Sequence, residues 1–436
     1  MRKFSVLMIV ALIASALAAC ATPTAQETQV VEVNKAASSL KADLVMWTSP
    51  MTGSDEKPLY QELIKRFQVE YPDINVKVEW VPWSDRDAKF SAALAAGTTP
   101  DVAYVFVEGI LGWVKDGVLA PLDGSISQPN WDDVLPLWQK AVSDDISSGA
   151  GVDKKLWMLP YLANGMNLMY NKDLLTQAGV EKAPVTWDDM MATCEKVKAL
   201  GADYYCFPLM GKTGYNQWMS FWWQAGGNMF SDDFKTLRIG DDAGLAAMQY
   251  MNTLNQKGYM PKESILADSE GLEQMWQEDK LAFKDLWAAS APSIKAPFTV
   301  VYQPTLMGKQ AKSFAAYGGW GMFSNSKQKD AASAWLNFLA NPESVTFWLQ
   351  WVAAHGTQFQ GVTKTTATLI TSSNQLFSDM VADQAVNGAV HQLTPGYMTY
   401  TDALGSQVEE MLLNNKDPKK ALEDAVKAIE ELQAND

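Results

Sequence analysis

From Ala42 onward, the sequence alternates short apolar segments of strand type with longer amphipathic segments of helix type. Residues 42–47 form a short apolar run, and residues 74–80 alternate apolar and polar side chains with period two, as a half-buried strand does. Between them, residues 56–70 carry apolar side chains at helical spacing. Repeated strand–helix units of this kind fold into a largely parallel sheet that is covered by helices. The pattern therefore predicts an α/β fold.

A second series of such units begins near Lys155. We expect strands at 156–161 and 166–171 on either side of a turn at 162–165. Thr186 and the aspartate three residues later have the spacing of a capping box, which predicts the start of a helix. The strands expected after this point are 204–210, 281–287, 297–304 and 317–323.

The N-terminal segment 1–19 has the pattern of a secretory signal. Arg2 and Lys3 precede an apolar run that is too short to span a membrane. The letters LAAC at its end resemble the lipobox of bacterial lipoproteins, which implies that Cys20 is lipidated and becomes the mature N-terminus. The alternative is a soluble secreted protein in which Cys20 is incidental. Residues 20–40 are small and polar without apolar periodicity, and we interpret them as a flexible tether.

Charge and composition limit the partners of the remaining chain, which is long enough for two or three domains. The net charge of −15 disfavours nucleic acid, because phosphates are neutralised by clustered Lys and Arg. After the signal, no apolar run reaches the length of a membrane span, so we expect membrane contact through the lipid alone. His355 and His391 lack the spacing of metal ligands, and we interpret each as a surface or loop residue. We expect neither a metal nor a cofactor.

The two cysteines after Cys20 are Cys194, on an expected helix, and Cys206, in the strand expected to follow it. A disulfide is permitted outside the cytoplasm. Because the sequence does not give their Cα separation, the paired and the unpaired state both stay open at this point.

Five ordered segments resemble one known family. They are LVMWTSP, FSAALAAGTTPDVAYV, LPYLANGMNLMYNKDLLTQAGV with TWDDM, LAFKDLW, and YGGWGMFSNSKQKDAASAWLNFL. The third is close to the signature Pro…Tyr-Asn-Lys-Asp-Leu…Gly…Pro-x-Thr-Trp. Over about residues 42–345, the chain thus resembles the extracellular sugar-binding proteins of ABC importers, of the large maltose-binding type.

The resemblance implies a two-lobed periplasmic-binding-protein-like fold with a hinge and an inter-lobe cleft. Lobe 1 would comprise 41–155 and 297–342, and lobe 2 would comprise 156–296 and 343–436. Ligands of open α/β sheets bind at the carboxyl ends of strands, and a ligand that contacts both lobes favours their closure.

The resemblance also implies the function, which is non-catalytic capture of a sugar or oligosaccharide. The captured carbohydrate would be delivered to the membrane subunits of an ABC importer. We expect a monomer, lipid-anchored on the outer face of the cell membrane, or in the periplasm if the host has two membranes.

A pyranose has C–H-rich faces and a rim of hydroxyls, so its site needs flat apolar platforms and planar polar groups. Residues 214–227 are rich in aromatic side chains. Tyr215 and Trp218 stand near the start of this segment, where the resembling proteins place cleft aromatics, and we expect both in the cleft. The aromatic residues at 221–223 are expected to pack the core.

Other candidates lie at strand ends. Trp287 ends a strand where the family has a sugar-stacking Trp, and Asp285 points to the same side by period two, although it is equally suited to a solvated or capping role. Asn164 matches the family's inter-lobe hydrogen-bonding position, which more often holds a carboxylate. Glu108 could accept two hydroxyls, or could simply be a carboxylate favoured at a helix N-terminus. The remaining candidate ligand-binding residues are Trp47, for which a core position is the alternative, Ser49, Trp83 and Trp320.

Two alternatives stay open. The same fold could bind an amino sugar, a polyamine or a polyol phosphate; the last would need Arg or Lys in the cleft, and the candidates include none. An extracellular carbohydrate-active enzyme would need two carboxyls about 5–9.5 Å apart, and 50 acidic residues leave room for such a pair. No nucleophile elbow or phosphate-binding glycine loop is present, and we assign no catalytic residue.

Overall fold

The computed structural model describes residues 39–434 except 232–233, 235, 268, 368, 370–373 and 393. The predicted signal segment, Cys20 and nearly all of the predicted tether lie outside the described residues. Within the described ranges, no helix is both long and apolar enough to cross a membrane.

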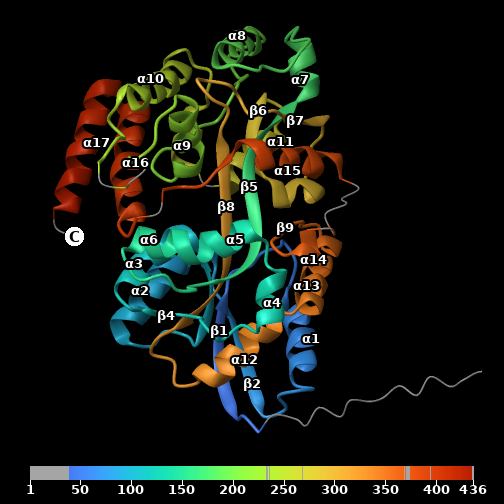
Figure 1. Cartoon of the computed structure of the whole chain (residues 1–436). Helices are drawn as coiled ribbons and strands as arrows, with labels where there is room; N and C mark the ends of the chain where they lie inside the picture. Colours follow the sequence, from blue (N-terminus) through green and yellow to red (C-terminus); the bar gives the residue numbers. More distant parts are fainter. Residues whose placement is uncertain are drawn as a thin grey trace, which may run out of the picture. The chain divides into compact units, whose positions relative to one another are not determined.

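Strands and helices alternate through most of the described chain (Figure 1). The strands are β1 (Ala42–Thr48), β2 (Ile74–Trp80), β3 (Val102–Phe106), β4 (Leu119–Ala120), β5 (Leu159–Asn171), β6 (Phe283–Trp287), β7 (Val300–Gln303), β8 (Ser313–Phe323), β9 (Gln360–Gly361) and β10 (Gly388–Ala389). The helices are α1 (Lys57–Phe67), α2 (Arg86–Ala96), α3 (Val107–Lys115), α4 (Gln128–Asp133), α5 (Pro136–Lys140), α6 (Ile146–Ala150), α7 (Lys172–Gln177), α8 (Trp187–Lys198), α9 (Tyr215–Gln224), α10 (Asp242–Gln256), α11 (Ser269–Gln277), α12 (Lys329–Ala340), α13 (Pro342–Ala354), α14 (Lys364–Ala367), α15 (Gln375–Asn387), α16 (Tyr397–Asn414) and α17 (Pro418–Gln433).

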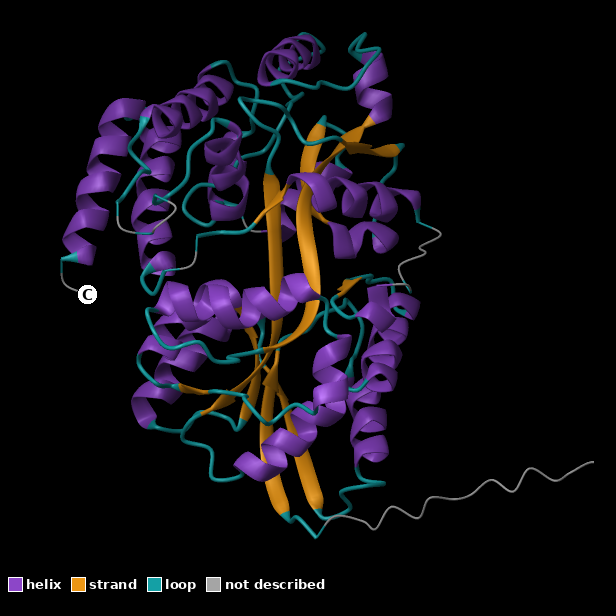
Figure 2. Cartoon of the chain, viewed as in Figure 1, coloured by secondary structure: helices purple, strands orange, loops and turns teal. Residues whose placement is uncertain are grey.

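Most of the parallel pairing lies where the chain forms successive strand–helix units, and the short strand β10 also pairs in parallel with β8. β1 pairs in parallel with β2 and with β3, as the sequence predicts. β8 is antiparallel to both β3 and β5, and β5 is antiparallel to β6 and β7. The expectation of a largely parallel sheet is therefore correct for the first series and wrong for the rest, because β5 and β8 are long strands that run in opposite directions past one another (Figure 2).

The turn expected at 162–165 is absent from the described chain, because β5 runs unbroken through these residues. They pair with β8, with a register irregularity between Pro160 and Leu162. Gly165 is required for close packing here, since a Cβ on it would lie 2.3 Å from the side chain of Gln384. A glycine that the sequence suggests as a turn residue instead lets another side chain approach the strand.

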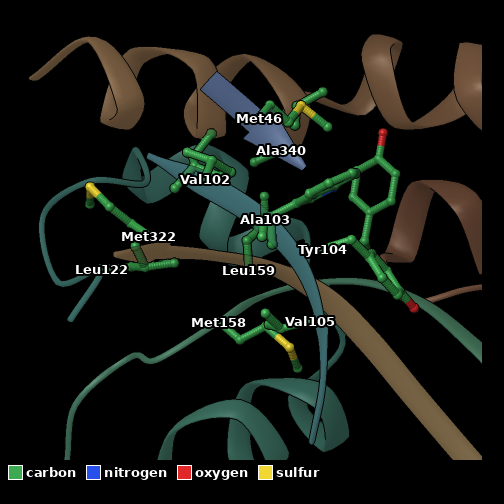
Figure 3. Packing of buried hydrophobic residues seen from close by; sticks show 14 of the residues in the cluster. Met46, Val102, Ala103, Tyr104, Val105, Leu122, Met158, Leu159, Met322 and Ala340 are labelled. Atoms are coloured by element: carbon green, nitrogen blue, oxygen red, sulfur yellow. The ribbon is translucent and has the colours of Figure 1, made fainter. Parts of the chain in front are cut away.

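Two large clusters of buried apolar side chains lie at opposite ends of β5 and β8. The first core draws residues from 42–163, 289 and 317–362, and Figure 3 shows part of it, with β3 packed between Met46 and Met158. The second core draws from 174–283, 306, 314 and 397–429. The expected lobe boundaries stay a prediction, and core membership differs from them in several places. Residues 156–163, 289 and 345–362, which include α13, pack in the first core although they were assigned to lobe 2, and Leu306 and Phe314 pack in the second core although they were assigned to lobe 1.

The second core contains a covalent link between α8 and the segment after it. Thr186 caps α8, and the capping box with Asp189 is present as predicted. Cys194 on α8 forms a disulfide with Cys206, with a Cα separation of 4.9 Å. Residues 204–210, expected as a strand, contribute only an isolated bridge at Tyr205, so the disulfide fixes an irregular segment to a helix.

We expect this disulfide to stabilise the second core by about 2–4 kcal/mol, because it restricts a short loop in the unfolded chain. In a chain that begins after Cys20, the double substitution Cys194→Ala with Cys206→Ala should lower the melting temperature, and a reducing agent should lower that of the wild type alone. Titration of two free thiols in denatured, unreduced wild-type protein would contradict the assignment.

Candidate ligand-binding cleft

A cavity of about 680 Å³ lies between the first and the second core. Tyr104 and Glu108 line it from the side of the first core, and Tyr215 and Phe314 line it from the side of the second. The aromatic side chains of the lining are Trp83, Tyr104, Phe106, Tyr215, Trp287, Phe314, Tyr317 and Phe359. A smaller hollow of about 460 Å³ near Lys41 and Lys329 is lined by polar and aliphatic residues, so it lacks the platforms that an organic ligand would need.

Trp83 provides the most open platform at the cavity. It follows β2, and 49% of the residue is exposed. Its indole Nε1 donates to the Pro50 carbonyl oxygen over 2.7 Å, which fixes the ring on one edge. The ring stands perpendicular to that of Tyr104, with centroids 6.3 Å apart. Tyr104 itself fits because residue 318 is glycine, where a Cβ would lie 2.0 Å from the tyrosine hydroxyl.

Arg86, at the start of α2, is a cavity residue that the sequence analysis missed. Its side chain is buried; Nη2 donates to the Tyr104 carbonyl oxygen over 2.9 Å, and its guanidinium carbon lies 4.4 Å from the centroid of the Phe106 ring. Burial lowers the pKa of Arg86 to about 10, so the group stays charged at neutral pH. The candidates chosen from the sequence include no base, and Arg86 adds one to the cavity lining.

Glu108 brings a buried carboxyl to the cavity from the first turn of α3. Its Oε1 atom is buried and finds no hydrogen-bond partner within the described part of the chain. Burial raises the pKa of this carboxyl to about 7. Because an unpaired buried oxygen is costly, it favours a guest that can donate a hydrogen bond to it.

Residues of the second core complete the cavity. Tyr215 and Asn216 occupy the first turn of α9 and both line it. Trp287, at the end of β6, also lines it, and its ring meets Phe314 edge-on with centroids 5.6 Å apart. These positions agree with the expectation for Tyr215 and Trp287.

Asn164 lies in the cavity lining on β5, where this strand passes from one core to the other. Its Oδ1 accepts from its neighbour Gly165 and from the backbone nitrogen of Ala289, over 2.9 and 3.0 Å. The amide thus ties the crossing strand to the segment that follows β6.

Five candidates lie outside the cavity lining: Trp47, Ser49, Trp218, Asp285 and Trp320. Trp47 and Trp320 belong to the first core, where Trp47 meets Phe90 and Trp320 meets Tyr104. Ser49 is buried beside the lining residue Pro50.

The expected cleft position of Trp218 is wrong, because this side chain is fully buried in the second core. Its Nε1 donates to the carbonyl oxygen of Gly211 over 3.2 Å. Asp285 is also turned away from the lining: its Oδ2 accepts from the side-chain amide of Gln217 over 2.5 Å. Burial raises the pKa of Asp285 to about 7. Phe221, like Trp218, packs in the second core, so only the first turn of α9 reaches the cavity.

Part of the missed lining could have been found from strand periodicity. Tyr104 and Phe106 stand two residues apart on β3, so they point to one side. Phe359, in contrast, comes from a loop after α13, and only the tertiary structure brings it to the cavity.

The fold with a cavity between two α/β cores is that of extracytoplasmic solute-binding proteins. A solute-binding protein from Thermotoga lettingae with bound α-D-tagatose matches with a TM-score of 0.75 at 19% identity, covering 89% of this chain and 98% of that one. A protein from Listeria monocytogenes in complex with cycloalternan also scores 0.75 at 19% identity, over 91% and 100%. The galactooligosaccharide-binding protein of Bacillus subtilis is 26% identical over 79% of this chain and 77% of its own length. The chain belongs to the bacterial extracellular solute-binding protein family, whose model matches residues 53–346.

The buried carboxyl of Glu108 predicts a pH-dependent cost to the fold. Above a pH of about 7, Glu108 is ionised in both the folded and the unfolded protein, and the buried charge destabilises the folded state. Below the pKa of 4.5 that the group has in the unfolded protein, it is protonated in both states and this destabilisation disappears. Glu108→Gln should therefore raise the stability of the unliganded protein at pH 8, by on the order of 3 kcal/mol. The gain should shrink as the pH falls through this window, as measured by urea unfolding.

The exposed Glu195 on α8 supplies the matched control. Glu195→Gln should change stability little at any pH. An effect of Glu108→Gln that stays constant from pH 4 to pH 8 would contradict the burial of an ionisable group at this site.

Proposed function

We propose that this protein captures a neutral sugar or oligosaccharide outside the cell and hands it, chemically unchanged, to the membrane subunits of an ABC importer. The observation that carries the proposal is the cavity of about 680 Å³, which combines aromatic platforms with a small set of buried polar groups. Trp83 and Trp287 would stack on the C–H faces of a pyranose, and Glu108 would accept a hydroxyl. The carbohydrates bound by the related proteins support the same class of ligand.

The cavity lining comes from both cores, and a bound ligand would therefore drive their closure. A guest that contacts Trp83 on one side and Trp287 on the other would favour an arrangement that brings the two cores together. β5 and β8 would serve as the hinge, because they are long strands that connect the cores.

Arg86 is the one observation that favours an anionic guest, such as a polyol phosphate. Its guanidinium, however, contacts the Tyr104 carbonyl oxygen and packs on Phe106, and only 3% of the residue is exposed. A phosphate site would present such a group openly to its ligand. A neutral carbohydrate therefore remains the preferred guest, and inorganic phosphate and a polyamine serve as counter-probes in the test.

The proposal predicts ligand-induced stabilisation. In thermal-shift experiments with galactotriose, maltotriose, cycloalternan and D-tagatose, at least one sugar should raise the melting temperature in a concentration-dependent way. The corresponding gain in the free energy of unfolding should reach about 2.7 kcal/mol at a sugar concentration of one hundred times Kd. A shift with phosphate or spermidine alone would contradict it, and turnover of a glycan would favour an enzyme instead.

Two tryptophans give a matched pair of variants. Trp287→Ala should abolish the sugar-induced shift and leave the unliganded melting temperature nearly unchanged, because this residue lines the cavity and is partly exposed. Trp218→Ala should destabilise the unliganded protein by about 3–5 kcal/mol, since it removes a fully buried indole. The reverse ranking of the two variants would overturn the placement of the cleft.

A lipid anchor at Cys20 belongs to the same proposal and is supported by the LAAC segment alone. Several acyl chains on one cysteine would hold the protein stably, since each buried CH₂ contributes about 0.8 kcal/mol. Cys20→Ala should move the protein from the membrane fraction to the soluble fraction of cells that express it. Retention of this variant on membranes would contradict the anchor.

A further inference from the structure

The loop between β10 and α16 places His391 directly behind the cavity. This residue was expected at the surface or in a loop, and it lies in a loop but is only 1% exposed. Four aromatic rings enclose the imidazole: Phe314 at a centroid distance of 4.5 Å, Tyr397 at 4.7 Å, Trp223 at 5.2 Å and Tyr215 at 5.6 Å. Two of these, Phe314 and Tyr215, line the cavity with their other faces.

Both ring nitrogens of His391 are hydrogen-bonded, which assigns the direction of each bond. Nε2 lies 3.2 Å from Oδ1 of Asn216, and Nδ1 contacts the hydroxyl of Tyr397. An amide oxygen only accepts, so Nε2 carries the proton and donates to Asn216. Nδ1 is then the acceptor, and the Tyr397 hydroxyl donates to it. Burial in this aromatic cage lowers the pKa of His391 to about 3, so the ring is neutral at physiological pH.

We propose that Tyr397 and His391 are positioning residues that fix the orientation of the Asn216 amide, and thereby set which hydrogen-bonding groups the cleft offers to its guest. With Oδ1 of Asn216 held by His391, the two N–H groups of the amide are directed to the cavity side. Asn216 and Tyr215 both line the cavity, so these two N–H donors lie where a guest would bind.

This orientation narrows the chemistry of the guest, a step that rests on the proposed function. The Asn216 amide donates at one side of the cavity, while Glu108 offers an unpaired oxygen from the side of the first core. A hydroxyl group can accept from the first and donate to the second. An ammonium group can only donate and a carboxylate can only accept, so neither satisfies both. The cleft is thus built for a neutral hydroxyl at this position, which argues against an amino sugar or polyamine bound there by its nitrogen.

An aromatic cage alone does not require an imidazole. A phenylalanine would fill the space between Trp223 and Phe314 without bringing two polar atoms into it, and a buried polar ring is costly unless both nitrogens are bonded. The two bonds remove that cost and connect α16 to the first turn of α9. Compared with a phenylalanine that only fills the space, His391 also positions the side chain of Asn216.

The first arm of the test needs no ligand. His355→Gln leaves His391 as the only histidine of the chain, and ¹⁵N-labelled histidine NMR then reports its tautomer. The expected result is a neutral ring protonated at Nε2, unchanged between about pH 8 and pH 5, because the pKa lies near 3. Adding Tyr397→Phe should shift the Nδ1 resonance, since that nitrogen loses its donor. A ring protonated at Nδ1, or one that is charged at pH 6, would overturn the proposal.

The second arm measures binding of galactotriose, maltotriose, cycloalternan and D-tagatose by calorimetry. Tyr397→Phe should weaken whichever of these the wild type binds by about tenfold, the loss expected for one well-oriented hydrogen bond. It should also lower the unliganded melting temperature, because Nδ1 of the buried His391 loses its donor. Tyr250→Phe is the control, because it removes another buried hydroxyl that donates within the second core, to the Trp187 carbonyl oxygen. Equal affinities of the two variants would overturn the positioning role. If no sugar binds, the carbohydrate proposal fails, and the NMR arm still decides the orientation of the chain of hydrogen bonds.

Discussion

The pairing of β5 with β8 is the constraint on which the rest of the structure depends. These two strands bond to each other from Leu159 to Gly165, and beyond that segment each continues into a different set of partners. The first and second core are therefore separate apolar clusters joined by paired backbone. A backbone connection resists stretching but can twist, whereas a shared apolar core would lock the two parts together. The cavity exists because apolar packing stops on either side of this crossing.

Two of the three buried polar side chains around the cavity have their hydrogen bonds satisfied within the protein, and the third does not. Asp285 is bonded to the amide of Gln217, and His391 has a partner on each nitrogen. Both are satisfied by the protein itself, so they stabilise the walls. Glu108 differs, since one of its oxygens has no partner among the described residues. Its missing partner is the clearest mark of where a guest belongs, because the free energy lost on folding can be recovered on binding.

Structural features that depend on neighbouring residues were predicted correctly from the sequence. The period-two segment became β2 within the expected bounds, and the capping box at Thr186 starts α8. Prediction from the sequence failed at positions whose surroundings are set by side chains far away in the chain. Gly165 accommodates Gln384 inside a strand, and His391 is buried by rings from three other elements, α9, β8 and α16. Of the cleft residues, Tyr215 and Trp287 followed from family position, whereas Arg86 carried no periodic signal that marks it as buried against aromatic rings.

Helix α9 shows why the aromatic residues of one segment could not be sorted by spacing alone. Tyr215 and Trp218 are three residues apart and so lie on nearly the same helical face, yet the first reaches the cavity and the second is sealed in the core. The difference is position along the axis, because only the first turn projects beyond the core. Trp218 and Trp222 meet edge-on behind it and hold the helix in place. The buried indoles would thus act on a ligand indirectly. They fix the one turn from which Tyr215 and Asn216 extend, and the proposed recognition of a sugar would depend on rigid placement of those two polar groups.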